Sequence, residues 1–503
     1  MLDPTTGPES ARGTGPLDLL PIPLRLDRSA PTPLHRQLAE QVRAAALSGA
    51  LAPNAPLPGS RTLAAALGVT RGVVTLALEE LVADGTLETR VGRGTWVARG
   101  AAVATREETV HLPAWLTLPG PAPIDGPTSV PGIHFRPGVA GTRVLDGKAW
   151  RAAWARAART VPGQEATGGD YGDPAGEPEF RAALAAFVGR ARGLRTDAGR
   201  VVVTPGSLGA LGLIARLLPP GSPVLVENPG YRAARQVLLD AGHEPVPVRV
   251  DGDGLVTGGL PPARLAVVTP SHQYPLGVRM SLPRRLALLR WAQTHDALIV
   301  EDDYDGEFRY GAPPLPPLAS LEGAGERVLY LGTLSKLLTP AVRTGFVVAP
   351  PALVPALTRA RALGDGGHDR MTQAALTFLL TGGHLDRHVR RARRWHGEQQ
   401  AALARTLAPL APGSRLGGIE AGLHACLHLP PQLPAGEVAA ELARRGVFVS
   451  AAEVYTFGGE PPNALILGYG GLTVAEVERG AREIVRVVRG AVLSPGGSRA
   501  PAG

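Results

Sequence analysis

ALIVEDDYD, residues 297–305, sets the fold class of the long C-terminal part of this chain. Its first four residues form an uninterrupted apolar run, and a dense group of carboxylates follows directly. A strand that is apolar on both faces is typical of a parallel sheet covered by helices on both sides. Similar apolar runs occur at 200–204, 223–227, 264–270 and 327–333, and helical patterns lie between them at 207–218, 231–241 and 283–294. This alternation predicts an α/β domain with a mostly parallel sheet.

Ligands of such sheets bind at the carboxyl ends of the strands, so the residues that follow each run carry the functional prediction. TPGSLGAL follows the first run and opens a helix, where the N–H groups of Gly206, Ser207 and Leu208 could hold a phosphate. ENPGY follows the second run and ends in Tyr231. Taken singly these signals are weak, because glycine often starts a helix and a lone tyrosine usually packs in a core.

Two further strand ends carry ionisable groups. EDDYD offers a carboxylate, Asp302, which could balance a buried cation such as a protonated pyridine nitrogen. GTLSK places Lys336 behind Thr333 and Ser335, and a lysine that is partly withdrawn from water can form a Schiff base. A phosphate cradle, a stacking ring, a pyridine partner and a reactive lysine together predict a pyridoxal-phosphate site with Lys336 as its catalytic residue.

Residues 33–98 follow a different pattern. Apolar residues four apart predict a helix over 34–48, Ser60 caps a short helix that ends at Leu67, and Thr70 caps a third helix that runs to about Ala83. Residues 86–98 alternate in polarity around a Gly-Arg-Gly turn, which is typical of a β-hairpin. Helix, helix–turn–helix and hairpin predict a winged helix-turn-helix domain.

In that domain the third helix would enter the major groove of DNA. Its exposed face would carry Arg71 and Thr75, Arg61 would contact a phosphate, and Arg93 would lie at the tip of the hairpin. The alternative is an ordinary three-helix domain with solvated arginines, because 33–98 holds six arginines against five acids. The acids, however, lie toward the far end of the third helix, so their position favours DNA binding.

Composition bounds the remaining predictions. Among 503 residues there is one cysteine, Cys426, which excludes a disulfide within the chain, and we expect no metal site. No stretch reaches 18 uninterrupted apolar residues, so we expect no membrane span and a cytoplasmic protein. We expect disordered tails at 1–32 and 491–503, the DNA-binding domain at 33–98, a proline-rich linker at 99–131, and the α/β domain at 132–490.

The head resembles the DNA-binding domain of GntR-type bacterial regulators through "LPGSR", "LGVTR" and "GRGTWV". The fused chain resembles the MocR subfamily, in which such a head precedes a fold-type-I aminotransferase-like domain. The body motifs are "YGDPAGEPEFRAAL" (171–184), "TPSHQYPLGV" (269–278), "EDDYDGEFRY" (301–310), "YLGTLSKLLTPAVRTGFVVAP" (330–350) and "GGHLDRHVRRARR" (382–394). The resemblance implies a homodimeric transcriptional regulator that binds operator DNA and senses pyridoxal phosphate, or an amine or amino acid that reacts with it.

The resemblance also implies residue roles. Lys336 would attach the cofactor, Asp302 would pair with its ring nitrogen, and Tyr304 would hydrogen-bond its hydroxyl group. Tyr231 would lie against the ring, and Tyr171 would reach the phosphate of a neighbouring subunit. The phosphate would be surrounded by Gly206, Ser207, Leu208, Thr333, Ser335 and Arg343, and DNA would be contacted by Arg61, Thr70, Arg71, Thr75, Arg93 and Gly94.

Two departures from the family pattern bear on activity. Leu208 replaces a glutamine near the phosphate. Ile466, in LILGYG, stands where aminotransferases carry the arginine that binds an α-carboxylate. The DNA-binding head and Ile466 favour a ligand-sensing regulator that controls vitamin B6 or amine metabolism genes, with little or no turnover. The alternative is a working aminotransferase with a DNA-binding appendage.

Overall fold

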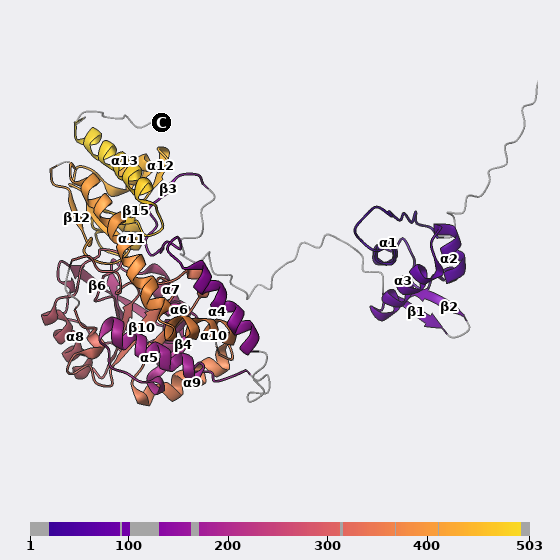
Figure 1. Ribbon diagram of the computed structural model, residues 1–503, viewed down its shortest axis with the longest axis horizontal. Helices are drawn as coiled ribbons and strands as arrows, with labels where there is room; N and C mark the ends of the chain where they lie inside the picture. The colour runs from indigo at the N-terminus through magenta and orange to yellow at the C-terminus, as the bar shows by residue number, and fades with distance from the viewer. Residues whose placement is uncertain are drawn as a thin grey trace, which may run out of the picture. The chain divides into compact units, whose positions relative to one another are not determined.

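The computed structural model describes residues 20–90, 93–100, 130–161, 171–311, 315–367, 369–410 and 412–493. The chain divides into two compact units, Met1–Pro119 and Gly120–Gly503, and Figure 1 draws both. We call them the head and the effector unit. The predictions for residues 1–19, for 101–129 of the linker and for 494–503 of the C-terminal tail lie outside the described residues.

The head has the predicted order of elements. Its helices are α1 (Leu34–Leu47), α2 (Ser60–Leu67) and α3 (Arg71–Ala83), and its hairpin pairs β1 (Leu87–Arg90) with β2 (Gly94–Val97) (Figure 1). Its apolar core contains Leu38, Leu63, Val74 and Leu81. Helix α2 begins one residue earlier than predicted, because Ser60, the expected cap, is the first helical residue and Gly59 is the N-cap.

Residues 20–32, which we assigned to a disordered tail, pack on the head instead. Leu20 and Leu24 are buried in its core. Two glutamines of α1 hold the backbone of this segment: Gln41 donates to and accepts from Arg25, and Gln37 does the same with Asp27. The prolines and glycines of residues 1–31 hid this packing, because they leave no sustained apolar period and side-chain amides of α1 help to fix the segment.

The effector unit is built on an eight-stranded sheet in the order β4-β11-β10-β9-β8-β5-β6-β7. The neighbours from β10 to β6 are parallel, whereas β11 and β7 run antiparallel. The strands are β4 (Val201–Thr204), β5 (Pro223–Asn228), β6 (Glu244–Asp251), β7 (Gly254–Leu255), β8 (Leu265–Val268), β9 (Leu298–Asp303), β10 (Val328–Thr333) and β11 (Gly345–Val348). The five predicted apolar strands are thus confirmed, with small shifts of their ends.

Helices cover both faces of this sheet, as the apolar strands required. One face packs against α6 (Gly206–Ala215), α7 (Arg232–Asp240) and α9 (Val354–Gly364). The other face packs against α8 (Leu282–Thr294), together with α4 (Gly147–Thr160), α5 (Pro178–Arg192) and α10 (Arg370–Thr381). Because the sheet is enclosed, its polar strand ends are the part of it that a ligand can reach.

A second, antiparallel sheet lies in the C-terminal part of the effector unit, in the order β12-β13-β16-β15. It packs with the long helix α11 (His384–Leu407), with α12 (Ala435–Arg444) and with α13 (Val474–Leu493), drawn in orange to yellow in Figure 1. Its strands are β12 (Arg415–Gly417), β13 (His424–His428), β15 (Ser450–Ala451) and β16 (Ala464–Gly468), and a separate pair joins β3 (Ile133–His134) to β14 (Val447–Phe448). No helix in the described ranges is long and apolar enough to cross a membrane.

Candidate functional site

Lys336 lies three residues beyond the end of β10, at the carboxyl edge of the large sheet. Its Nζ donates a hydrogen bond to the carbonyl oxygen of Gly138 at 2.5 Å. Burial lowers the pKa of the Lys336 ammonium group, although Asp302 and Asp305 act in the opposite direction, and Arg343 lowers it further. A lysine whose neutral form is favoured in this way is suited to attack a carbonyl carbon.

Asp302 and its neighbour Asp303 point to opposite faces of the sheet, because side chains alternate along β9. Asp303 accepts a hydrogen bond at 2.5 Å from Arg192 and another at 2.8 Å from Tyr330, all within the buried interior. Asp302 faces the other way, and its Oδ1 is buried with no hydrogen-bond partner among the described residues. Burial and the charge of Asp303 raise the pKa of Asp302 to about 7. An unpaired buried carboxylate is matched to a cationic ligand atom.

The residues expected to hold a phosphate lie at the start of α6. Gly206 has a φ of +83°, which a residue with a side chain adopts only with strain. The Arg343 guanidinium lies over it, since a Cβ built on Gly206 would come within 3.7 Å of Nη2. The Oγ of Ser335 is buried and unpartnered among the described residues, and Thr333 accepts from the Ser335 N–H at 3.1 Å. Ser207 and Leu208 follow in the first turn, whose N–H groups have no intrahelical partner.

Tyr304 is held by a buried ion pair behind it. Its hydroxyl group donates to the carbonyl oxygen of His272 at 2.9 Å. The His272 Nδ1 lies 3.1 Å from the Asp305 carboxylate, and its Nε2 lies 3.1 Å from the carbonyl oxygen of Gly418. Because both ring nitrogens face acceptors, both donate, and the ring is an imidazolium ion paired with Asp305. Burial opposes that charge, but Asp305 outweighs it, so the pKa of His272 is raised.

His272, Asp305 and His424 place three atoms of metal-ligand type within 4.8 Å of one another. A metal ion needs the deprotonated ring nitrogens of histidine. His424 directs its Nε2 to the carbonyl oxygen of Pro275 at 3.1 Å, and its buried Nδ1 has no partner among the described residues. His272, however, already donates from both nitrogens, so its ring offers a metal no lone pair. The chemistry of this cluster therefore fits a structural ion pair better than a metal site.

Aromatic rings surround the same edge. The Tyr274 ring makes edge contacts with the rings of Tyr231, Tyr304, Tyr455 and His424, with centroids 5.5–5.9 Å apart. Ile466 on β16 is fully buried in the apolar cluster that includes Tyr455. The position expected to carry a carboxylate-binding arginine is therefore part of an apolar and aromatic wall.

Most predicted cofactor residues thus meet at one edge of the sheet, and one does not. Tyr171 is 87% exposed, whereas Lys336, Asp302, Tyr304, Tyr231, Arg343 and the start of α6 belong to the edge just described. The unpaired oxygen of Asp302, the glycine cradle and the buried lysine fit pyridoxal phosphate in charge and in chemistry.

Comparison with known proteins, made over the whole chain, agrees with the fold and the site just described. Residues 34–97 match the model of bacterial regulatory proteins of the gntR family, and residues 144–484 match that of aminotransferase class I and II. The chain is 35% identical to the HTH-type pyridoxine biosynthesis transcriptional regulator PdxR of Corynebacterium glutamicum, over 90% of this chain and 95% of that protein. It is also 35% identical to the probable rhizopine catabolism regulatory protein MocR of Rhizobium meliloti, over 92% and 95%.

The chain belongs to the MocR-type GntR regulators.

Solved structures place the effector unit of this MocR-type regulator among the fold-type-I aminotransferases. It is similar to an archaeal alanine:glyoxylate aminotransferase, with 27% identity and a TM-score of 0.65 over 72% of this chain and 92% of that one. The α-aminoadipate aminotransferase LysN of Thermus thermophilus gives 27% identity and a TM-score of 0.64 over 72% and 93%. The predicted fold class is confirmed, and this fold implies dependence on pyridoxal phosphate.

The head of this MocR-type regulator implies DNA binding. The residues predicted to contact DNA lie on α2, on α3 and in the hairpin. Arg61 and Arg71 are exposed at the starts of α2 and α3, and Arg71 Nε donates to Ser60 Oγ at 3.2 Å. Thr75 donates to the Arg71 carbonyl oxygen at 3.0 Å, and Thr70 is the N-cap of α3. Arg93 and Gly94 are exposed where the hairpin turns into β2.

The acids of α3 do not oppose that surface. Arg43 of α1 pairs with Glu80 at 3.1 Å and with Asp84 at 2.7 Å, at the far end of the helix. These carboxylates are therefore engaged within the head, as the argument from position required.

Sequence reasoning missed several residues of the site in this MocR-type regulator. His272 and Tyr274 follow β8, so the rule that ligands lie at strand ends could have identified them. Tyr455 and Gly138 come from segments far away in the chain, and no local pattern marks them. Glu227, at the end of β5, lies in ENPGY, the motif from which only Tyr231 was selected.

Proposed function

We propose that this regulator binds pyridoxal phosphate at the strand ends of its effector unit and uses the bound cofactor to sense a small molecule. The observation that carries the proposal is the meeting of the Lys336 amine, the unpaired Asp302 carboxylate and the cradle of Gly206 and Arg343 at one edge of the sheet. When bound, pyridoxal phosphate supplies an aldehyde that reacts with primary amines and a ring that withdraws electrons.

The residues around it would act as follows. Lys336 would hold the cofactor covalently, and Asp302 would stabilise a proton on the ring nitrogen. Tyr304 would hydrogen-bond the ring hydroxyl, and Tyr231 would lie against the ring. Five groups would hold the phosphate, namely the start of α6 (Gly206, Ser207 and Leu208), Thr333, Ser335, Arg343 and, from a second copy of the chain, Tyr171.

The effector is pyridoxal phosphate itself or an amine or amino acid that reacts with it. The relatives named for pyridoxine biosynthesis and for rhizopine catabolism illustrate these two possibilities. The regulated genes would accordingly serve vitamin B6 synthesis or the catabolism of the amine. Acting on operator DNA, the protein would work in the cytoplasm, associated with the nucleoid.

The test is to map the genomic fragments that the full-length protein binds, with and without pyridoxal phosphate. We expect specific fragments in which occupancy changes when the cofactor is added. Occupancy that stays the same with pyridoxal phosphate, and with a panel of amines added to it, would contradict the sensor function.

A working aminotransferase remains the second candidate, because the cofactor residues match those of the enzymes. Ile466 argues against it, since a buried isoleucine cannot supply the paired hydrogen bonds that an arginine gives a carboxylate. A keto-acid assay over a broad panel of amino donors separates the two.

We also propose that the protein is a homodimer with shared sites. The high exposure of Tyr171 supports a role toward a second subunit. Light scattering should give twice the chain mass, and Tyr171→Phe should weaken pyridoxal-phosphate binding without changing that mass. A monomer with wild-type cofactor affinity would exclude shared sites.

A further inference from the structure

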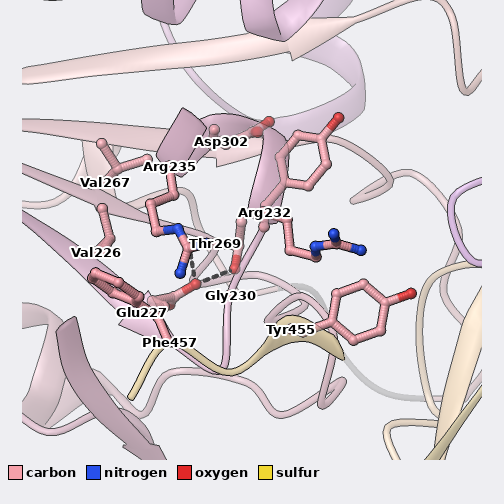
Figure 2. A pocket seen from close by; sticks show the side chains of 12 residues that line it. Val226, Glu227, Gly230, Arg232, Arg235, Val267, Thr269, Asp302, Tyr455 and Phe457 are labelled. Carbon is pink, nitrogen blue, oxygen red and sulfur yellow. Dashed lines mark hydrogen bonds between the residues drawn. The ribbon is translucent and has the colours of Figure 1, made fainter. Parts of the chain in front are cut away.

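A small cavity beside Asp302 is lined by a second buried carboxyl group, Glu227, to which none of the roles above gives a function. The cavity measures about 40 Å³. Its polar lining comes from Glu227 at the end of β5, Thr269 after β8, Asp302 of β9, Tyr231 just before α7, Arg232 and Arg235 of α7, and Tyr455. Figure 2 shows Glu227, Thr269 and Arg235 gathered together, with the Arg232 and Tyr455 side chains extending away from them.

One side of Glu227 is fixed and the other is not. Its Oε2 accepts from the Thr269 hydroxyl group at 2.5 Å, from the Thr269 N–H at 3.2 Å and from Gln273 at 3.2 Å. Its Oε1 is buried with no partner among the described residues, as are Asp302 Oδ1 and Arg235 Nε. Buried polar atoms normally find a partner in protein or in ordered water.

The size of the cavity decides what that partner is. A small-molecule pocket measures roughly 300–1,000 Å³, whereas one water molecule needs only about 10–15 Å³ of such space and two or more polar partners. A chamber of about 40 Å³ with two carboxylate oxygens and a guanidinium donor on its wall fits water and excludes a further organic ligand.

We propose that Glu227 is a positioning residue for Asp302: through water in this chamber the two carboxyl groups share a proton, and Glu227 thereby sets the pH range in which Asp302 is charged. The inference rests on the proposed binding of pyridoxal phosphate, whose ring nitrogen Asp302 would face. It assigns to Glu227 a role that neither the fold nor the sequence motif assigned.

Both carboxyl groups hold their proton more tightly than a solvated carboxyl group does. Burial raises the pKa of Glu227 to about 7, and the hydrogen bonds from Thr269 and Gln273 only partly oppose this. The pKa of Asp302 is also about 7, raised by burial, by Asp303, by Asp305 and by Glu227 itself, and lowered by Lys336. Tyr231, Arg232, Arg235 and Tyr455 complete the charged and titratable groups on the chamber wall.

The direction of the effect follows from these signs. An ionised Glu227 makes it harder for Asp302 to lose its proton, so Asp302 becomes charged only near neutral pH. Removing the charge of Glu227 lowers the pKa of Asp302. Asp302 then stays ionised, and able to balance a protonated ring, at more acidic pH.

The experiment measures the dissociation constant of pyridoxal phosphate for the full-length protein, by absorbance, from pH 5.5 to 8.5. In Glu227→Gln, which keeps the shape and the acceptor oxygen, we expect the midpoint of the profile to fall by about one pH unit. The ratio of the dissociation constant at pH 6 to that at pH 8.5 should be smaller in Glu227→Gln than in wild type, by up to about tenfold. Glu227→Asp, which restores a titrating group, should return the midpoint toward wild type.

Glu301→Gln is the matched control. Glu301 is also buried, and burial also raises its pKa to about 7, but it lies on the other face of β9 and accepts from the N–H groups of Leu318 and Ala319. Its removal should leave the midpoint unchanged. Equal midpoints in wild type and Glu227→Gln, or an equal shift in Glu301→Gln, would overturn the proposal.

Two further outcomes keep the test decisive. If Glu227→Gln does not fold by circular dichroism, the wild-type profile alone suffices, because a dissociation constant that is flat from pH 6 to pH 8 would overturn the inference. If no protein binds pyridoxal phosphate at any pH, the proposed function fails, and this inference fails with it. Binding with an unshifted midpoint, in contrast, removes the inference alone.

Discussion

The amine of Lys336 donates a hydrogen bond to the carbonyl oxygen of Gly138, and burial already favours its neutral form. We predict that the purified protein with pyridoxal phosphate absorbs in the visible range, and that borohydride reduction leaves a pyridoxyl group on Lys336 that mass spectrometry can locate. Lys336→Ala should lose the visible band while its circular dichroism stays native. A variant that retains the band would falsify the assignment of Lys336.

Asp302 carries a cost in stability that can be measured without the cofactor. Its pKa is about 7 in the folded protein, against about 3.9 when unfolded. The folded state therefore holds the proton more tightly, and the stability of the cofactor-free protein falls as pH rises from about 4 to 7. We predict that Asp302→Asn raises the free energy of unfolding at pH 8, by up to about 4 kcal/mol, but not at pH 4.

Denaturant unfolding at both pH values checks this prediction. Glu301→Gln is a useful comparison, since that carboxyl is buried but has two backbone donors that an amide cannot satisfy equally. Equal stability of wild type and Asp302→Asn at pH 8 would mean that Asp302 is better solvated than its buried Oδ1 indicates.

Single residues also show where sequence reasoning stops. Asp302, Lys336 and Gly206 could be predicted because each follows an apolar strand, and the fold brings strand ends together. The carbonyl of Gly138, the imidazolium of His272 and the ring of Tyr455 could not, because their contacts join segments distant in the chain. Protonation is equally hidden, since it depends on burial and on neighbouring charges.

Among the elements, α3 and the start of α2 carry the DNA prediction. Arg71 is exposed and tied to Ser60 by one nitrogen, which leaves other donors of its guanidinium for a base edge. We predict that Arg71→Ala weakens specific binding by about 1–3 kcal/mol and relaxes sequence preference. Arg61→Ala should weaken binding to all sequences evenly and lower the salt dependence.

Titration of operator and random duplexes at several salt concentrations distinguishes the two effects. Thr358→Ala in the effector unit, an exchange remote from the head in sequence, serves as a control that should bind like wild type. If Arg61→Ala and Arg71→Ala both bind both duplexes as wild type does, α3 is not the recognition helix.

Elements were predicted well where one signal dominated. The continuous apolar runs identified β4, β5, β8, β9 and β10, but β6 was missed because three of its eight residues are exposed and two are prolines. The strand β11 was hidden inside the long motif at 330–350. It lies between β4 and β10 and pairs antiparallel with both, and no local sequence pattern encodes this direction.

At the scale of the whole molecule, the two compact units have separate apolar cores. We predict two thermal transitions by calorimetry, one for each unit. Pyridoxal phosphate at about a hundredfold excess over its dissociation constant should stabilise the effector unit by about 2.7 kcal/mol. The transition of the head should not move, and a common shift of both would show that the units unfold together.

Catalysis is also a property of the whole site. Transamination needs the substrate held in one orientation, which can supply several kcal/mol of a barrier. Ile466 is buried in an apolar cluster and cannot clamp a carboxylate as an arginine would. We predict spectral changes with amines but slow or absent turnover with common amino acids, in a keto-acid assay over a broad donor panel. Multiple turnovers near the enzyme median of about 10 per second would establish the aminotransferase instead.

The segment at residues 20–32 has a practical consequence for anyone who wishes to study the head in isolation. Sequence similarity to the gntR family begins at residue 34, which invites a cut just before α1. Such a cut would remove Leu20 and Leu24 from the core, strip Gln37 and Gln41 of their backbone partners, and leave the carbonyl of Gly68 without Arg28 at the turn before α3. A fragment that begins before Leu20 keeps all of these contacts. The position of the N-terminal truncation therefore decides whether a DNA-binding assay reports on the native head or on a destabilised one.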